Sequence, residues 1–481
     1  MMRVKGWLGS EAPGRVIPFP GRARVQEAVP QTSRLSRDLR LAAVPVAYAG
    51  RRAAGYGKRL LGKPAAEIDR DIQLRTAEHL VEVLGDLKGC LAKLGQMAAV
   101  FRSAVPLAPA AFGEIAGETL SRLQDSAPPM MPALVEQVMA RNLGPSWRNQ
   151  FREFTDRAAA AASLGQVHRA VWHDGRDVAV KIMYPGAREA VASDLRQLRS
   201  MSGLIGAVMP GADVCAVIEM VCAVVDGELD YRLEAANQQR CADLLRDDPE
   251  FLVPDVVMVA DEVLISDWLD GAALTRVVAT GTAEERGRAG LTVFRFLETV
   301  ADRGGILYSD VHPGNFLLLP DGRLGVVDFG AVGGYPPDFR ATVADIAEAL
   351  LNGTPADLED ALRAHGFVHP GTAFDAEELL RIATPFIQVV LRDDFHMSTD
   401  WLRDQVTDIA AISLSNVFRQ MTLPPALIPL ARKAGTTVGT LSLLGTDGIR
   451  GELLSWYPEI GDAVRRYEDR VSGPLGFPGL R

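Results

Sequence analysis

Two acidic residues and an asparagine in the second half of the chain have the spacing of a phosphoryl-transfer centre. Asp310 and Asn315 are five positions apart, the interval of the protein-kinase catalytic loop, where the Asp is the base and the Asn a metal ligand. Asp328 begins a D-F-G sequence thirteen positions after Asn315. Mg2+ prefers carboxylate and amide oxygens and keeps several waters, so Asn315, Asp328 and nucleotide phosphates would suffice to bind it. Each short sequence also occurs in ordinary turns, and only their joint spacing predicts this chemistry.

The stretch between the two metal ligands predicts a β-hairpin. Residues 316–319 and 324–327 are mostly apolar and flank the turn Pro320, Asp321 and Gly322. A hairpin returns the chain to the end from which it started. We therefore expect Asn315 and Asp328 to lie together.

A lysine upstream could supply the cation for the nucleotide phosphates. Lys181 lies in a predicted strand, where Ala179 shares its face and could contact adenine while Val178, Val180 and Ile182 point inward. A strand lysine over a sheet edge is a common alternative, and the downstream acids favour the nucleotide role.

The segment before this strand is unusual for a phosphate-covering loop. It contains Ala160, Ala161, Ala162 and Ser163, whereas such loops are usually rich in glycine because glycine lets backbone N–H groups approach phosphate. We expect the alanines to make this segment stiffer.

A predicted helical stretch from about Asp213 to Asn237 could carry the carboxylate that holds Lys181. Asp230 and Glu234 are i,i+4 neighbours on it and Glu228 lies to one side. Three such acids more often form a solvated surface.

A second lysine lies on another predicted helix, residues 65–103. Gly85, Gly89, Lys93 and Gln96 share one face, and the glycines would let this face approach another surface closely. An exposed lysine with incidental glycines is the alternative.

Composition and charge limit the class of protein. With 481 residues, 48% hydrophobic and 23% charged, the chain has the composition of a globular protein. Its formal charge of −10 argues against nucleic acid as a partner. Residues 1–63 are different, with thirteen Lys or Arg and three Asp or Glu. They form either a solvated arm or one attracted to an anionic membrane face, at about 1 kcal/mol per basic residue.

Cysteine, histidine and hydropathy patterns indicate a cytoplasmic protein. The four cysteines form no C-x-x-C pair, which favours reduced thiols, and the seven histidines lack the spacing of a zinc site. No apolar stretch reaches the length of a spanning helix. Contact with the inner membrane face would be peripheral, through residues 1–63.

The region after the D-F-G predicts what kind of substrate is used. The chain passes through Tyr335, Pro336 and Pro337 directly into a predicted helix, with no long activation segment and no A-P-E sequence. Protein kinases use that segment in activation, so its absence argues against protein substrates. The remainder is predicted to be helical, with helix starts near residues 337–338, 354–355, 375–377, 398–400 and 424–425.

Together these motifs resemble the AarF/UbiB atypical kinases, a family with a protein-kinase-like fold associated with ubiquinone and other prenyl-lipid metabolism. The resemblance covers roughly residues 80–335. Its K-x-G-Q, alanine-rich and E-x-D motifs and its lysine strand correspond to residues 93–96, 160–163, 228–230 and 178–181.

The resemblance implies a role for each of these residues. Lys181 would pair with Glu234 and contact the phosphates of ATP, Asn315 and Asp328 would bind Mg2+, and Asp310 would be the base. The alanine-rich segment, Ala179, and Asp267 and Leu269 in the linker between the lobes would contact the nucleotide. Lys93 and Gln96 would cover the active site, with Lys93 near Glu228 and Asp230, an arrangement that disfavours protein substrates.

Some positions depart from the family pattern. Ala158 stands where proline is common, and Tyr308 stands where histidine usually precedes the catalytic Asp by two positions. A hydrophobic C-terminal anchor present in some members is missing. The 53 positions between Lys181 and Glu234 imply inserted helices.

We therefore expect an α+β, bilobal, protein-kinase-like fold with a small antiparallel-sheet N-lobe, a helical C-lobe and an N-terminal helical extension. The predicted parts are a basic arm (1–63), the extension (64–150), the N-lobe (151–271), the C-lobe (272–470) and a tail (471–481). The predicted function is that of a Mg-ATP-dependent kinase or ATPase acting on or near a prenyl-lipid or quinone precursor. The alternatives are a nucleotide-dependent lipid-binding scaffold and, less favoured, a protein kinase.

Overall fold

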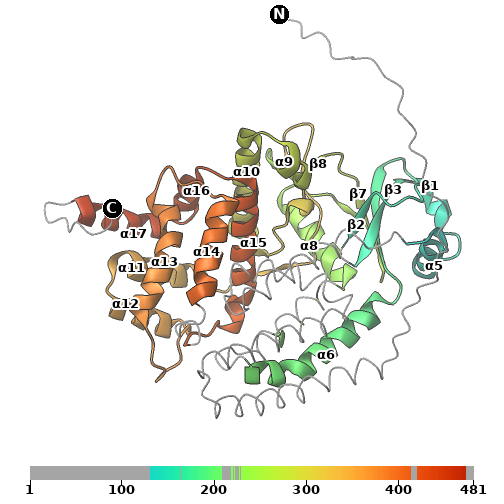
Figure 1. The fold of residues 1–481 in the computed structure, drawn as a ribbon. Helices are drawn as coiled ribbons and strands as arrows, with labels where there is room; N and C mark the ends of the chain where they lie inside the picture. Colours follow the sequence, from blue (N-terminus) through green and yellow to red (C-terminus); the bar gives the residue numbers. More distant parts are fainter. Residues whose placement is uncertain are drawn as a thin grey trace, which may run out of the picture. The chain divides into compact units, whose positions relative to one another are not determined.

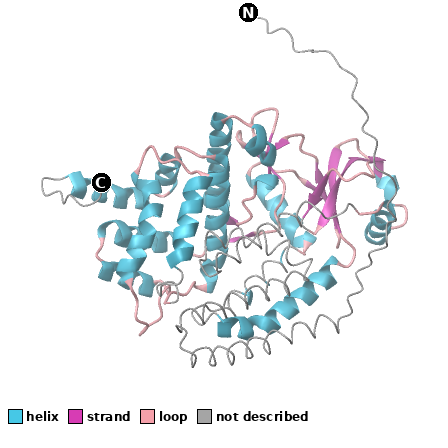
Figure 2. Ribbon diagram, viewed as in Figure 1, coloured by secondary structure: helices cyan, strands magenta, loops and turns pink. Residues whose placement is uncertain are grey.

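The computed structural model describes residues 130–162, 164–208, 229–412 and 420–472, with 218, 219, 222 and 227. The predicted arm, most of the extension, and residues 473–481 of the tail lie outside these ranges. Lys93, Gln96, Ser163 and Glu228 do so as well, so the roles predicted for them stay predictions. Figures 1 and 2 show a lobe built on a β-sheet and a lobe built mainly of helices.

The first lobe is an antiparallel sheet in the order β1-β3-β4-β7-β6, with β2 paired to β3. Val178, Val180 and Ile182 are fully buried in its central strand, as β-branched residues on one face of a strand usually are. The strands of this sheet are β1 (Phe151–Phe154), β2 (Ala160–Ala162), β3 (Gly165–Trp172), β4 (Asp177–Met183), β6 (Val256–Val259) and β7 (Val263–Asp267).

One face of the sheet is covered by α5 (Pro132–Leu143) and the short 3-10 helix η1 (Trp147–Gln150). Val138 and Trp147 form a single core with residues of β1, β3, β4 and β7. The helix lies in the predicted extension, yet its apolar side chains belong to the core of the sheet lobe. The described part of the extension is therefore built into this lobe.

The other face of the sheet packs against α6 (Ala187–Val208) and α8 (Tyr231–Leu244). Leu264 of β7 belongs to this second core, together with Leu195 and Tyr231, whereas its neighbours on β7 point to the first core. The helix α6 accounts for part of the long insertion predicted between Lys181 and Glu234.

The start of α8 corrects the sequence prediction of one continuous helix from residue 213 to 237. Asp230 has an extended backbone, and its side chain accepts hydrogen bonds from the N–H groups of Arg232 and Leu233. A capping carboxylate satisfies N–H groups that have no partner within the helix. A new helix therefore begins at Tyr231, and Asp230 precedes it. The second strand of the β6–β7 hairpin ends at Asp267.

The second lobe contains two small sheets packed on the helix α10 (Ala283–Gly304). Val293, Phe296 and Val300 of α10 share a core with Phe316 and Phe329. The strand orders are β5-β11-β10-β8 and β12-β9. Their bounds are β5 (Phe251–Leu252), β8 (Ala272–Ala273), β9 (Ile306–Tyr308), β10 (Phe316–Leu318), β11 (Leu324–Val326) and β12 (Val332–Gly334).

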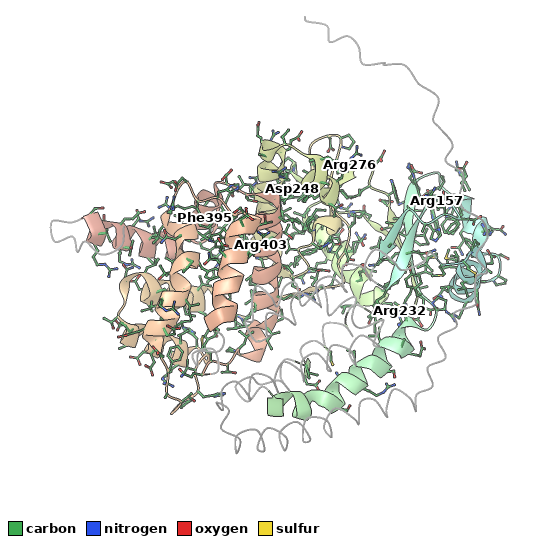
Figure 3. The ribbon with its side chains drawn as sticks, viewed as in Figure 1. Arg157, Arg232, Asp248, Arg276, Phe395 and Arg403 are labelled. Carbon is green, nitrogen blue, oxygen red and sulfur yellow. The ribbon has the colours of Figure 1, made fainter. Side chains whose placement is uncertain are left out.

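The rest of this lobe is helical, and several helices begin where the sequence predicts. Asp338, Thr354 and Asp375 are the N-cap residues of α11, α12 and α13. Phe395, labelled in Figure 3, packs edge-on against Trp401 of α14 with ring centroids 5.2 Å apart. The helices are α9 (Leu274–Thr280), α10 (Ala283–Gly304), η2 (Pro313–Asn315), α11 (Phe339–Asn352), α12 (Pro355–Ala364), α13 (Ala376–Leu391), α14 (Thr399–Ile412), η3 (Pro425–Leu427), α15 (Ile428–Leu444), α16 (Ile449–Trp456) and α17 (Pro458–Ser472).

Among the described helices, none combines the length and the hydropathy of a membrane-crossing segment.

The core shared by α5 and the sheet predicts a large effect for one substitution. Trp147 is fully buried, so Trp147→Ala should lower the free energy of unfolding by about 3–5 kcal/mol through lost burial and a residual cavity. Urea denaturation followed by circular dichroism measures this. Met131→Ala, at a side chain that is 65% exposed, is the control and should change little. Equal effects of the two substitutions would show that η1 does not belong to this core.

Candidate active site

Lys181 lies on the partly exposed face of β4. Residues 178, 180 and 182 are fully buried, whereas Ala179 and Lys181 are partly exposed. This alternation confirms the face assignment made from the sequence. The opposite face packs against α5, so the lysine side chain points away from that core.

The lysine ammonium contacts two carboxylates from different parts of the chain. Its Nζ atom lies 2.6 Å from Oε1 of Glu234 on α8 and 3.4 Å from Oδ2 of Asp328 in the D-F-G sequence. The side chains of Lys181 and Glu234 are 17% and 2% exposed. The fold thus brings together residues that are 53 and 147 positions apart.

The two carboxylates change the pKa of Lys181. Burial alone would lower the pKa of Lys181, but the carboxylates of Asp328 and Glu234 outweigh it and raise that pKa well above its ordinary value. Lys181 therefore keeps its proton at neutral pH. Tyr231 lies beside it, with its ring centroid 5.3 Å from Nζ, a distance at which a cation and an aromatic ring attract each other.

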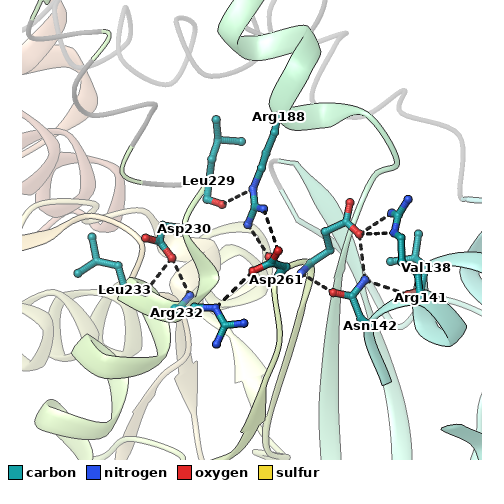
Figure 4. A network of polar contacts seen from close by, with 10 residues as sticks. Val138, Arg141, Asn142, Arg188, Leu229, Asp230, Arg232, Leu233 and Asp261 are labelled. Carbon is teal, nitrogen blue, oxygen red and sulfur yellow. Dashed lines mark hydrogen bonds and ion pairs between the residues drawn. The ribbon is translucent and has the colours of Figure 1, made fainter. Parts of the chain in front are cut away.

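Contacts at the start of α8 fix the position of Glu234. The backbone N–H of Glu234 donates to the carbonyl of Asp230 over 2.9 Å, and the Asp230 side chain caps the helix (Figure 4). Arg188 and Arg232 both contact Asp261 in the turn before β7. Asp230 is thus placed as a helix cap one turn before Glu234, and the Lys93 that was predicted beside it lies outside the described residues.

The D-F-G sequence is held by backbone contacts on both sides. Asn237 of α8 donates to the carbonyl of Phe329 over 3.4 Å, and the Phe329 ring is fully buried. The hydroxyl of Tyr308 donates to the carbonyl of Asp328 over 2.7 Å. The tyrosine that departs from the family pattern therefore fixes Asp328 directly.

The predicted metal ligands lie at the same end of the β10–β11 hairpin. The hairpin pairs Phe316 with Val326, as predicted from the sequence. The N–H of Val327 donates to the carbonyl of Asn315 over 3.1 Å, so Asn315 is fastened to the residue before Asp328. The Asn315 side chain donates to the carbonyl of Asp310 over 3.1 Å, which links it to the predicted base.

These residues suit a magnesium-bound nucleotide chemically. Asn315 and Asp328 supply an amide and a carboxylate, ligands that Mg2+ accepts alongside phosphate oxygens and water. Within the described residues, no group of three or more His, Cys, Asp or Glu side chains could hold a metal by itself.

The alanine-rich segment forms a strand. Residues 160–162 are β2, which pairs with β3 through Ala160 and Val167, Ala161 and Gln166, and Ala162 and Gly165. A Cβ atom at Gly165 would lie 2.1 Å from the carbonyl oxygen of Ile182. Glycine is therefore required at the inner position of this turn, while the outer segment tolerates alanine.

The linker residues make different contacts from each other. Asp267 pairs with Arg176 at 3.4 Å, so its carboxylate faces the β3–β4 turn. Burial raises the pKa of Asp267, and Arg176 opposes that effect. Leu269 packs closely on Gly325 of β11. The linker between the lobes therefore packs against the β10–β11 hairpin, next to the predicted metal ligands.

Sequence reasoning missed a row of residues on α15. Arg432 lies 3.5 Å from a carboxylate oxygen of Asp310, and Thr436 and Thr440 donate to the carbonyls of Ser309 and Val311. Their spacing of four marks one helical face. That signal was present in the sequence, but it could not show which loop this face contacts.

The neighbouring Lys433 holds the segment after the D-F-G. Its Nζ atom lies 2.7 Å from Glu298 of α10 and also donates to the hydroxyl of Tyr335. Tyr457 donates to the same glutamate over 2.7 Å. This buried network was not predicted from the sequence.

Comparisons with known proteins agree with the kinase-like arrangement. Residues 122–361 match the family described as ABC1 atypical kinase-like domain. The chain is 28% identical over 417 residues to the mitochondrial atypical kinase COQ8 of Saccharomyces cerevisiae, covering 82% of this chain and 78% of that protein. It is 31% identical over 298 residues to the uncharacterized protein slr1919 of Synechocystis sp., covering 60% and 52%.

Two further relatives show how much of the chain is shared. The mitochondrial atypical kinase coq-8 of Caenorhabditis elegans is 28% identical over 329 residues, covering 66% of this chain and 42% of that protein. A structure of Rv3197 with erythromycin from Mycobacterium tuberculosis is 35% identical, with a TM-score of 0.59, covering 82% and 99%. The chain thus spans about half the length of slr1919 and less of coq-8. The fold is the bilobal, α+β, kinase-like fold that the sequence predicts.

The Lys181–Glu234 contact predicts a non-additive effect on stability. Lys181→Met leaves the buried Glu234 carboxylate without its nearest cation and should cost about 3–5 kcal/mol, whereas replacing both partners by apolar residues should cost much less. Urea unfolding of Lys181→Met, Glu234→Leu and the double variant measures the coupling. Arg403→Met, which removes an exposed partner of Asp400, should cost less than about 1 kcal/mol. Additive losses in the double variant would contradict the pairing.

Proposed function

The chain belongs to the AarF/UbiB family of atypical kinases, and from this premise we propose that it is a Mg-ATP-dependent kinase or ATPase. We propose further that it acts in, or regulates, quinone or other prenyl-lipid metabolism and does not phosphorylate proteins. The observation that carries the proposal is the contact of the Lys181 ammonium with both Glu234 and Asp328. In protein kinases the corresponding Lys–Glu pair and D-F-G aspartate must both be in place for transfer.

In this proposal each residue has one task. Lys181 contacts the nucleotide phosphates, Asn315 and Asp328 hold Mg2+, and Asp310 accepts the proton of the attacking hydroxyl or water. Bound Mg2+ would neutralise charge on the phosphate oxygens. The rest of the described site supplies rigid positioning, because Tyr308 and Asn237 fix the D-F-G backbone.

The short connection after the D-F-G supports a non-protein acceptor. Only residues 329–338 separate Asp328 from α11, and part of that stretch is β12, which pairs with β9. This stretch is too short to form the platform on which protein kinases bind a peptide. A small molecule or lipid hydroxyl, or water, remains as acceptor.

The proposed partners are a nucleotide and a prenyl-lipid or quinone precursor. The basic composition of residues 1–63 supports peripheral contact with an anionic membrane on its cytoplasmic side. Relatives named COQ8 and coq-8 are described as mitochondrial atypical kinases, a name that supports the kinase assignment.

A nucleotide-dependent scaffold with little phosphoryl transfer is the second candidate. Incubation of the protein with radiolabelled ATP and membrane extract separates the two. Labelled lipid supports the kinase, free phosphate alone supports the ATPase, and neither product supports the scaffold. A hydrolysis rate stimulated by liposomes that contain quinone precursors would also support the proposed partner.

Substitution of the D-F-G aspartate tests the site directly. Asp328→Asn removes a charged ligand and should lower ATP turnover by about 100- to 1,000-fold, the usual loss for one electrostatic contact to a transition state. Asp321→Asn is the matched control, because Asp321 lies in the exposed hairpin turn and pairs with Arg323. Its turnover should equal that of the unmodified protein. Unchanged hydrolysis by Asp328→Asn would remove the assignment.

A further inference from the structure

The helix α15 lies against the catalytic loop although it begins more than 100 residues later in the chain. Figure 1 shows α15 beside α10, and it also contacts β9, the strand that leads into the loop. Arg432, Thr436 and Thr440 are spaced four apart, so they lie in a row along one face of the helix. All three contact consecutive residues 309–311 of the loop.

The two threonines lie against the backbone on either side of Asp310. Thr440 Oγ1 donates to the carbonyl of Val311 over 2.6 Å. Thr436 Oγ1 lies 3.3 Å from the carbonyl oxygen of Ser309 and closer, at 2.9 Å, to that of Arg432 in its own helix, so it packs on the loop. Ser309 is further fixed by hydrogen bonds to the carbonyl of Ala331 from both its N–H and its hydroxyl. The backbone of the loop is therefore held from α15 and from the D-F-G side.

Arg432 contacts the carboxylate itself. Its guanidinium lies 3.5 Å from Asp310 Oδ1, and the two side chains are 6% and 10% exposed. A carboxylate with so little access to water is costly to ionise unless a cation lies close to it. Arginine suits this task because its guanidinium is always charged and planar.

Other ionisable groups near the catalytic loop are Tyr308, Asp328 and Lys433. Tyr308 precedes the loop, and burial followed by the carboxylates of Asp328 and Asp310 raises its pKa well above the ordinary value. It therefore stays neutral. Asp328 carries the same charge as Asp310, and Lys433 is engaged by Glu298 and Tyr335.

We propose that Arg432 is a positioning residue of the phosphoryl-transfer site, which holds the Asp310 carboxylate aimed at the acceptor. With Thr436 and Thr440 it makes α15 the element that fixes the catalytic loop in a chain with only a short connection after the D-F-G. This role rests on the proposed Mg-ATP-dependent activity.

The test is whether kcat and nucleotide binding separate when α15 is changed in the full chain. Arg432→Gln should lower kcat for ATP turnover at neutral pH by about 100-fold through misplacement of the base. Its Kd for Mg-ATP, measured by calorimetry, should stay unchanged, because its contact Asp310 is assigned to the acceptor and not to the nucleotide.

Two arginine variants give the controls. Arg432→Lys keeps the charge and should recover part of the lost kcat. Arg403→Gln, on the exposed side of α14 (Figure 3), should match the unmodified protein in kcat and in Kd. A structural ion pair alone would change stability and leave the kcat of the folded protein unaltered.

A second substitution covers the case in which Arg432→Gln does not fold. Thr440→Val has nearly the same shape and removes only the hydrogen bond to Val311, so it should lower kcat by about 2- to 10-fold with the Kd for Mg-ATP unchanged. An active unmodified protein whose kcat is unaltered in Arg432→Gln or in Thr440→Val would overturn the role of α15 alone. An unmodified protein that neither binds nor hydrolyses Mg-ATP would overturn the proposed function as well.

Discussion

A largely buried ammonium group needs carboxylates close to it, and this requirement organises the site. Lys181 is 17% exposed and contacts Glu234 and Asp328. An unpaired charge with so little access to water would be unfavourable, so the sheet, α8 and the D-F-G sequence must be held in fixed relation. The caps and hydrogen bonds around Asp230, Asn237 and Tyr308 provide that relation. The same cation is well placed to exchange a carboxylate for the phosphates of a nucleotide.

The second lobe holds the opposite side of the site by a different means. Backbone carbonyls of the catalytic loop are bound by threonines of α15, and the carboxylate of Asp310 faces Arg432. Lys433 on the same helix binds the segment that follows the D-F-G. One helix therefore contacts both the catalytic loop and the segment that follows the D-F-G. Such contacts give positioning, which is most of what phosphoryl transfer requires from a protein.

The segment above the predicted nucleotide face also differs from a flexible glycine-rich loop. Residues 160–162 pair with β3 as a strand, and glycine is needed only at position 165, where a side chain would meet Ile182. An alanine at the outer positions has less conformational freedom than glycine. A stiffer β2 segment agrees with a site whose residues are held in place by contacts within each lobe.

The sequence by itself determined the features that depend on neighbouring residues. These are the Asp310–Asn315–Asp328 spacing, the hairpin between the metal ligands, the alternation around Lys181 and the N-caps of the C-lobe helices, because strand period and turn chemistry act locally. Only the tertiary structure decided that Asp230 ends one segment and caps the next, that α5 enters the core of the sheet, and that Arg432 meets Asp310. Those contacts depend on which helix face packs on which loop, and residues more than 100 positions apart are brought together by the packing of the whole core, which no local pattern encodes.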